Sequence, residues 1–440
     1  MNPEPARTSP TYLEVEDPRT GGVDLVAVEV SRHTEGGAPW TLRRARSDEA
    51  EALRGAFAAA PWAVFAGVRY RLPQPTPEQA PQTLALSSHA PVVLGAAEIP
   101  KPWGREIWFT GMEKRGVCSA AGVPLPWLVA AGREAFFGKG LTEIVLLKVL
   151  DPLPVPVWGD LYTEIHREKN EVYVCVGVDP AVARDGAGAL RFGIAPEAWR
   201  QAGGDPAAFK ARYLAAVRAY EAVRRSIDAR LESHAVSHRA GIGAASDANI
   251  DARQLAAWHD ALPAALLEEE SARRDEMNAF TALHPLRPGD VARVPVGVPH
   301  ALQAGVRVVE FQTATYERAI VSFAQKVLTQ PQWDTEEALA LLDVPASLAS
   351  PLVVRACSDL GTVNASERIV DFPGFTVERV TRADNLALGN ADAYALLFLV
   401  SGTFRTREKA LIPEGASLLA RGAACEVTGV GVLLVARPRH

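Results

Sequence analysis

The sequence has few cysteines, no block of basic residues and no long apolar stretch. Its four cysteines form no Cys-x-x-Cys pair, which is typical of reduced thiols; they are Cys118, Cys175, Cys357 and Cys425. The net charge is −6 without any Lys/Arg-rich run, so we expect no nucleic-acid partner. The apolar stretch 393–400 is too short to cross a bilayer, and the first 18 residues lack the apolar core of a secretory signal. We therefore expect a cytoplasmic protein with no membrane partner.

The chain does have enough apolar residues for more than one core. Its 440 residues, 48% of them hydrophobic, predict two or three domains. Residues 1–95 mix strand-like runs with one helical stretch and carry no recognisable chemistry, so we expect an N-terminal accessory α+β region. From 96 to 198 the pattern is mainly β, with short apolar runs at 143–150 and 171–178.

A helical segment, 199–280, interrupts the β pattern. Apolar residues recur there at spacings of three and four, which predicts one face of a long helix: Phe209, Tyr213, Val217, Tyr220, Val223, Ile227 and Leu231. Strand patterns return at 281–330, which we assign to the same domain as 96–198. Residues 345–440 alternate strands and turns, as in a small all-β sandwich or barrel. The predicted fold class is therefore mainly β with a helical insertion.

The residues that indicate chemistry begin with Glu164 and His166. Residues two apart on a strand point to the same face, so these two side chains converge. A polar turn follows, and Glu171 opens the next apolar strand. If the two strands pair, Glu171 returns beside His166. Two carboxylates and an imidazole suit Zn, Fe, Mn or Co.

His300 is the fourth candidate ligand. It closes the segment 289–300, in which a turn, a short strand and another turn present the imidazole. Pro295 and Gly297 fix the second turn. The sequence therefore predicts one metal centre built from two distant stretches of β structure.

These two segments resemble the paired motifs of the cupin superfamily. The second one fits G-x5-P-x-G-x2-H at every fixed position, with Gly289, Pro295, Gly297 and His300. The first one has Glu164 where most cupins carry histidine. The resemblance implies jelly-roll barrels, with two cupin domains, the helical block and the N-terminal region.

The resemblance is sharper to the type I phosphomannose isomerases and covers roughly 100–440. Those enzymes carry a Lys-Pro-Trp-Gly segment, a lysine strand, a Gln-x-His pair, a lysine two positions before the metal glutamate, and a later E-x-Q to T-Y-R run. The corresponding residues here are 101–104, Lys148, Glu164 to His166, Lys169 to Glu171, and 310–318. A helical insertion and a second, metal-free cupin domain complete that family pattern.

Three departures bear on the substrate. Glu164 replaces the glutamine of the family and adds negative charge at the metal. A four-residue turn replaces the longer lid after His166. The Ser-Asp pair that usually precedes the arginine is missing, so Arg318 is reached by a shorter path.

The resemblance implies an aldose–ketose isomerase acting on a sugar or sugar phosphate of the mannose 6-phosphate type. The metal, Zn2+ or alternatively Fe, Mn or Co, would lie on Glu164, His166, Glu171 and His300. Moving a proton between adjacent carbons needs an electrophile and a base. Lys148 and Lys169 are candidates for the base, and Arg318 for holding an enediolate or phosphate oxygen.

Several alternatives stay open at this point. Glu164 could be a salt-bridging carboxylate beside the ligands, and Lys148, Lys169 and Arg318 could be structural. A cupin oxygenase or other Fe or Mn enzyme would use the same ligands with another reaction. A non-catalytic sugar-binding or regulatory protein would keep the fold without turnover. The oligomeric state has no signal in the sequence.

Overall fold

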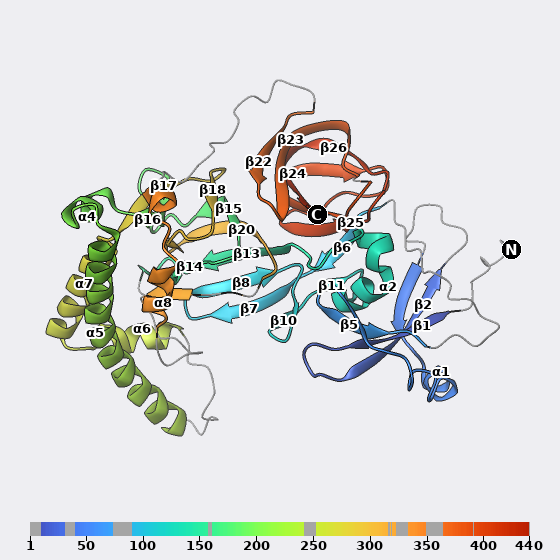
Figure 1. Cartoon of the computed structure of the whole chain (residues 1–440), viewed down its shortest axis with the longest axis horizontal. Helices are drawn as coiled ribbons and strands as arrows, with labels where there is room; N and C mark the ends of the chain where they lie inside the picture. The colour runs from blue at the N-terminus through green and yellow to red at the C-terminus, as the bar shows by residue number, and fades with distance from the viewer. Residues whose placement is uncertain are drawn as a thin grey trace.

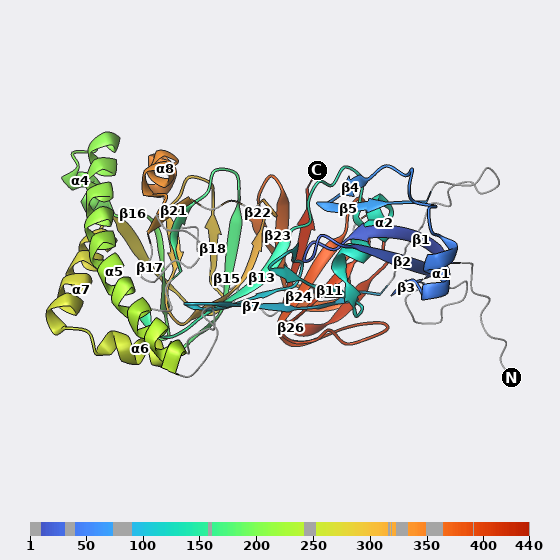
Figure 2. The same ribbon diagram turned by 90° about the horizontal axis from the view of Figure 1, so that it is seen from below.

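The computed structural model describes residues 10–30, 40–73, 90–156, 161–241, 252–315, 317, 319–322, 333–348, 364–389 and 391–439. The chain forms a row of units: an N-terminal sheet, a central pair of sheets and a helical block, with the C-terminal sheet beside the centre (Figure 1). In the view from below, the N-terminal sheet and the helices lie at opposite ends (Figure 2). The described helices include none long and apolar enough to span a membrane.

The N-terminal unit is an antiparallel sheet of five strands in the order β3-β2-β1-β5-β4. Its elements are β1 (Thr11–Glu16), β2 (Val23–Val30), β3 (Trp40–Arg44), α1 (Ser47–Ala52), β4 (Ala63–Phe65) and β5 (Val68–Arg71). The inner faces of its strands pack on α2 (Leu125–Phe137), whose apolar residues are almost all buried. The predicted α+β character of this region is therefore confirmed.

Two facing antiparallel sheets form the central barrel. The first has the order β18-β15-β20-β13-β8-β7, and the second has the order β17-β16-β19-β14-β21. The strands of the first are β7 (Ala97–Lys101), β8 (Gly104–Trp108), β13 (Leu146–Pro152), β15 (Glu171–Val178), β18 (Val291–Val294) and β20 (Val306–Gln312). Those of the second are β14 (Thr163–Ile165), β16 (Gly188–Ile194), β17 (Thr281–Leu286), β19 (His300–Leu302) and β21 (Ala319–Ser322). Apolar side chains between the sheets form a separate buried cluster.

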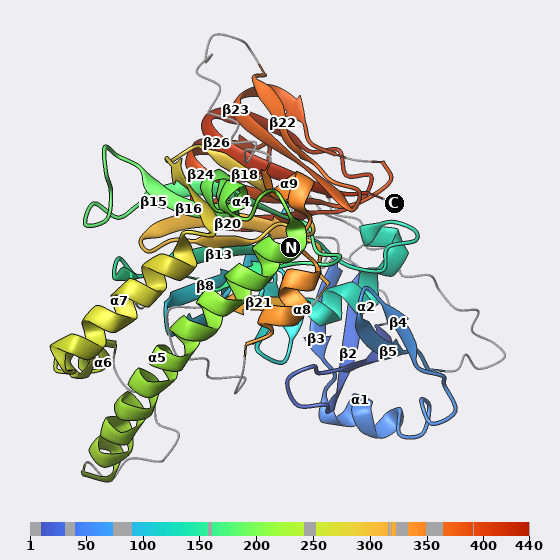
Figure 3. The ribbon, with the colours of Figure 1, turned by 60° about the vertical axis from the view of Figure 1, so that its left-hand side comes forward.

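The helical insertion covers one end of this barrel. It comprises α4 (Pro196–Gln201), α5 (Pro206–Gly241), α6 (Ala252–Asp260) and α7 (Ala264–Asn278), and α8 (Thr335–Ala340) and α9 (Val344–Leu348) follow the barrel. The seven apolar residues predicted to share one helix face are all buried on α5. Figure 3 shows α5 and α7 side by side. Their contact includes a hydrogen bond from the Tyr220 hydroxyl to Glu270 Oε1 at 3.0 Å.

The C-terminal sheet contains strands from two parts of the chain. Its order is β12-β11-β6-β25-β24-β26-β23-β22. The C-terminal strands are β22 (Ser366–Asp371), β23 (Phe375–Ala387), β24 (Ala395–Thr406), β25 (Gly415–Leu419) and β26 (Glu426–Pro438); the others are β6 (Val92–Gly95), β11 (Ser119–Ala120) and β12 (Val123–Pro124). A separate hairpin consists of β9 (Met112–Glu113) and β10 (Gly116–Val117). Segments before residue 125 thus join the N-terminal, central and C-terminal units, and one apolar cluster runs through all three.

Candidate metal centre

The four predicted ligands meet between the two central sheets. Glu164 on β14 lies directly opposite His300 on β19. His166 follows the end of β14, and Glu171 begins β15 in the facing sheet. One possible ligand atom from each residue lies within 4.8 Å of the others. The described structure therefore brings all four side chains together.

The route by which they meet differs from the one expected from the sequence. The strands that carry Glu164 and Glu171 do not pair with each other, so the condition on which that route depended is not met. Instead β14 pairs with β19 and β21, whereas β15 pairs with β18 and β20. The cluster forms because the two sheets face each other, which the local turn at 167–170 does not reveal.

Glu171 lies at the middle of the cluster. Its Oε1 is 3.4 Å from His166 Nε2, and its Oε2 is 3.3 Å from His300 Nε2. Glu164 Oε1 is 4.0 Å from the Nε2 atom of each histidine. Both histidines and Glu171 are 1% exposed, so water competes little for their polar atoms.

The buried nitrogens of the two histidines fit a divalent cation. His300 Nδ1 lies 3.0 Å from the carbonyl oxygen of Val298, which fixes Nδ1 as the donor and leaves the Nε2 lone pair facing the cluster. Among the described residues, His300 Nε2 and both ring nitrogens of His166 lack a hydrogen bond. Buried polar atoms are normally paired, and an ion bound by the Nε2 atom of each histidine and by two carboxylates would satisfy these two Nε2 atoms.

The glycine turn of the second motif connects the two histidines. Gly297 has a φ of +78°, and its N–H donates to the carbonyl oxygen of His166 at 2.8 Å. A Cβ at this position would lie 2.8 Å from Asp343 Cβ. Both the backbone conformation and the close approach therefore require glycine. The turn that precedes His300 is in this way tied to the strand end that carries His166.

Two further side chains hold the Glu171 carboxylate. The Tyr173 hydroxyl donates to Oε2 at 3.0 Å, and Lys169 Nζ lies 2.5 Å from Oε1. Burial alone would raise the pKa of Glu171, but Lys169 and His166 outweigh burial and hold it well below its usual range. Burial and then the Glu171 charge raise the pKa of Tyr173, so its hydroxyl stays protonated and can donate.

A chain of alternating charges extends from the cluster along the first sheet. Lys148 Nζ lies 3.3 Å from Glu310 Oε2 and 4.0 Å from Glu106 Oε2. Glu106 is also 3.2 Å from Lys101 Nζ and accepts a hydrogen bond from Trp108 Nε1 at 2.6 Å. Burial lowers the pKa of Lys148, but Glu310 and Glu106 outweigh burial and raise it. Lys148 is therefore held as an ammonium group.

Lys169 experiences a similar field. Burial lowers its pKa, whereas Glu171 and then Glu164 raise it, and the net shift is upward. The protein charges around both lysines thus favour the ammonium form. The prediction that one of them acts as a base depends on a metal charge nearby to oppose these carboxylates.

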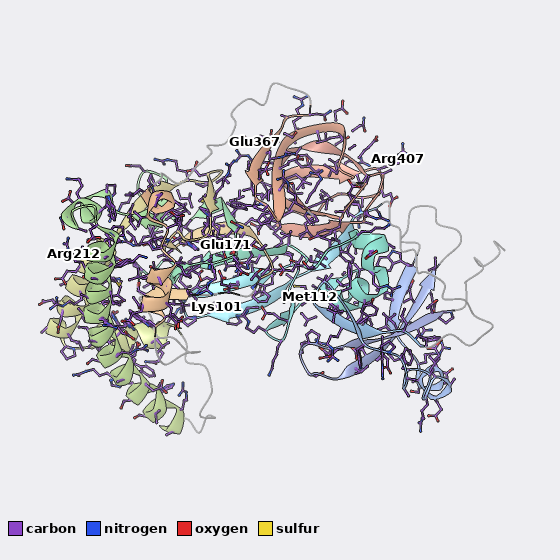
Figure 4. All side chains as sticks on the ribbon, viewed as in Figure 1. Lys101, Met112, Glu171, Arg212, Glu367 and Arg407 are labelled. Atoms are coloured by element: carbon purple, nitrogen blue, oxygen red, sulfur yellow. The ribbon has the colours of Figure 1, made fainter. Side chains whose placement is uncertain are left out.

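A cavity of about 410 Å³ opens beside the cluster. Glu164, Lys148 and Lys169 form part of its wall, which also includes residues of the β9–β10 hairpin and the turn at 66–67 between β4 and β5. Figure 4 labels Glu171 among the central strands, with Lys101 and Met112 below it in that view. The N-terminal region therefore contributes directly to the wall of the candidate site.

Sequence reasoning missed some residues of this site and named one that is not described. Arg318 lies outside the described residues. Lys101 was noted only as part of the Lys-Pro-Trp-Gly segment, and Glu106 had no signal because its partners come from other strands. Glu317 accepts backbone N–H groups of residues 167 and 168, which fixes the turn after His166.

Comparisons with known proteins give a consistent picture of the fold. No family model and no curated protein sequence matches the chain. Solved structures do match, including the mannose 6-phosphate isomerase from Bacillus subtilis, with 14% identity, a TM-score of 0.52 and coverage of 79% of this chain and 99% of that one. A lysine variant of the phosphomannose isomerase from Salmonella typhimurium matches with 12% identity, a TM-score of 0.53 and coverage of 80% and 100%.

These likenesses extend over the full length of the solved enzymes and leave about a fifth of this chain unmatched. They agree with the facing antiparallel sheets and the helical insertion seen here. The predicted cupin architecture, mainly β with a helical insertion, is therefore confirmed, and the chain has the fold of the phosphomannose isomerases.

Proposed function

We propose that the chain is a metal-dependent aldose–ketose isomerase that acts on a sugar or sugar phosphate of the mannose 6-phosphate and fructose 6-phosphate type. The fold supports this proposal, because two solved proteins that share it are mannose 6-phosphate or phosphomannose isomerases. Since one fold can host several chemistries, the main support comes from the residues of the site.

Glu164, His166, Glu171 and His300 would hold the ion. Two imidazoles and two carboxylates suit Zn2+, with Fe, Mn and Co as alternatives of similar ligand preference. When bound, such an ion supplies a Lewis acid that polarises a sugar oxygen. Tyr173 and Lys169 orient the Glu171 carboxylate by contacts at 3.0 and 2.5 Å.

The two lysines would act on the sugar itself. Both line the cavity beside Glu164, and both are held as ammonium groups by neighbouring carboxylates. An ammonium group has three N–H donors, so each can keep a carboxylate partner and still donate to a sugar oxygen. Such donors stabilise the negative charge that grows on that oxygen when a proton leaves the adjacent carbon. Arg318 stays a candidate for the same role.

One observation carries the proposal: two buried lysines line the same cavity as Glu164, and Glu164 belongs to the cluster in which buried histidine nitrogens lack hydrogen bonds. A purely structural cluster would have no need to leave these nitrogens without partners. A metal site without lysines would supply a Lewis acid but fewer donors for the oxygens of an enediolate. The combination fits proton transfer next to a carbonyl.

The experiment is isomerisation in D2O. Metal-loaded protein is mixed with mannose, fructose or their 6-phosphates, and NMR follows both the product and the deuterium on the carbon next to the carbonyl. We expect interconversion with deuterium uptake, and none in His166→Ala/His300→Ala protein. Oxygen consumption by the Fe- or Mn-loaded protein without isomerisation would instead support an oxygenase. Absence of turnover on all four sugars would support a binding protein.

A further inference from the structure

The charges on the cavity wall set the chemical class of the sugar. Four described cations line the cavity, namely Lys101, Arg115, Lys148 and Lys169. Five carboxylates line it as well, namely Glu106, Glu113, Glu143, Glu164 and Glu317. Glu164 would bind the ion together with Glu171, and the other described charges of the wall then balance, with four cations and four carboxylates.

Each of these cations is next to a carboxylate. For the three lysines, the distances from Nζ to the nearest carboxylate oxygen are 3.2 Å at Lys101, 3.3 Å at Lys148 and 2.5 Å at Lys169. The side chains of these lysines are 14% exposed or less, so solvent screens the pairs weakly. Their positive charge is used to compensate buried carboxylates and offers little net attraction to a dianion.

Arg115 is the described cation on the hairpin side of the cavity, and Glu113 holds it. The guanidinium donates to both Glu113 oxygens, from Nε at 3.2 Å and from Nη2 at 2.6 Å. The guanidinium carbon of Arg115, Cζ, also lies 5.2 Å from the centre of the Trp108 ring. This bidentate geometry is the one that an arginine uses to bind a phosphate. Glu113 therefore competes with a phosphate for two of the guanidinium N–H groups.

We propose that the pocket takes an unphosphorylated sugar and that Glu113, by engaging Arg115, is a residue that disfavours a phosphate group. This inference rests on the proposed isomerase function for the reaction. The preference for an unphosphorylated sugar does not depend on that reaction. A neutral sugar needs hydrogen-bond donors and acceptors, whereas a phosphate dianion needs uncompensated positive charge. The charged side chains of the described wall supply many hydrogen-bond donors and acceptors.

The experiment compares the metal-loaded wild type with Glu113→Gln and Glu143→Gln. Both substitutions remove one negative charge from the cavity wall, but only the first one removes the partner of Arg115. We expect the wild type to have a kcat/KM for mannose at least about tenfold above that for mannose 6-phosphate. We expect Glu113→Gln to shift this ratio towards the phosphate by about fivefold or more, since a charge-assisted hydrogen bond becomes available. Glu143→Gln should shift it less than about twofold.

A second readout separates this inference from the proposed function. Calorimetry measures the Kd of inorganic phosphate for the same three metal-loaded proteins, and it needs no turnover. Tighter phosphate binding in Glu113→Gln alone supports the inference even if no sugar is isomerised, in which case only the proposed reaction fails. A wild type that prefers mannose 6-phosphate overturns the inference while leaving the isomerase intact. Equal shifts in both variants overturn the role given to Glu113.

Discussion

Replacing Tyr173 by phenylalanine should weaken metal binding without removing any ligand. The Tyr173 hydroxyl donates to Glu171 Oε2 at 3.0 Å, and the same oxygen lies 3.3 Å from His300 Nε2. Phenylalanine keeps the ring, whose centroid is 6.1 Å from that of His300, so the packing is preserved. Only the hydrogen bond that orients the carboxylate is lost.

The size of the effect follows from the position of Tyr173 behind the ligand. Loss of such a partner typically lowers metal affinity by about 10- to 100-fold. At a metal concentration of about 1,000 times the wild-type Kd, the ion adds about 4.1 kcal/mol to the free energy of unfolding. A 10- to 100-fold weaker site at the same concentration would gain only about 2.7 to 1.4 kcal/mol. Chelator competition measures the affinity, and denaturant unfolding with and without metal measures the stabilisation.

Tyr220→Phe is the matched control. It removes a buried tyrosine–glutamate hydrogen bond of the same length, 3.0 Å to Glu270, but in the helical block. It should cost about 1 kcal/mol of stability, as a typical hydrogen bond does, and leave the Kd for the metal unchanged. If Tyr173→Phe bound the ion as tightly as Tyr220→Phe, the proposed orientation of Glu171 towards an ion would be refuted.

Three further predictions follow from the same structure. Gly297→Ala should cost about 1–3 kcal/mol of stability and weaken metal binding. The control Gly203→Ala, at φ +68° with open space around it, should cost less and leave the metal affinity unchanged. Unfolding and metal titrations of both variants check this prediction. Lys148→Met should still bind the ion, as metal analysis can check, but its kcat should fall by about 10²- to 10⁴-fold. A kcat within threefold of wild type would exclude Lys148 from catalysis. Arg43 lowers the pKa of Glu49 from 4.5 to about 2, so this pair stabilises the fold above pH 4.5 and loses that contribution as the pH falls towards 2. Unfolding at several pH values should show a smaller loss over this range in Glu49→Gln, and an identical loss would contradict the assignment.

The sequence allowed the cluster of candidate ligands and the main helix to be predicted because their signals are local. The spacing of Glu164 and His166, the strand that Glu171 opens and the glycine turn before His300 each lie within a dozen residues. The buried face of α5 follows from its spacing of three and four. These features need no knowledge of which strands are neighbours.

The surroundings of the ligands could not be predicted in this way, because they depend on strand order. Glu106 contacts Lys148 because β8 lies beside β13, although the two residues are 42 positions apart in the sequence (148 − 106). The sheet order also places β14 and β15 in opposite sheets, so Glu171 reaches His166 from the facing sheet and not from a neighbouring strand. The contribution of residues 66 and 67 to the cavity depends on how the N-terminal sheet packs on α2.

The most direct test of the central claim is the metal content and coordination of the purified protein. After reloading with Zn2+, elemental analysis should give one ion per chain, and X-ray absorption should show a shell of nitrogen and oxygen with imidazole scattering. The His166→Ala/His300→Ala protein should fold and lose both signals. A wild type that binds no ion, or a double variant that binds it equally well in the same shell, would contradict the account.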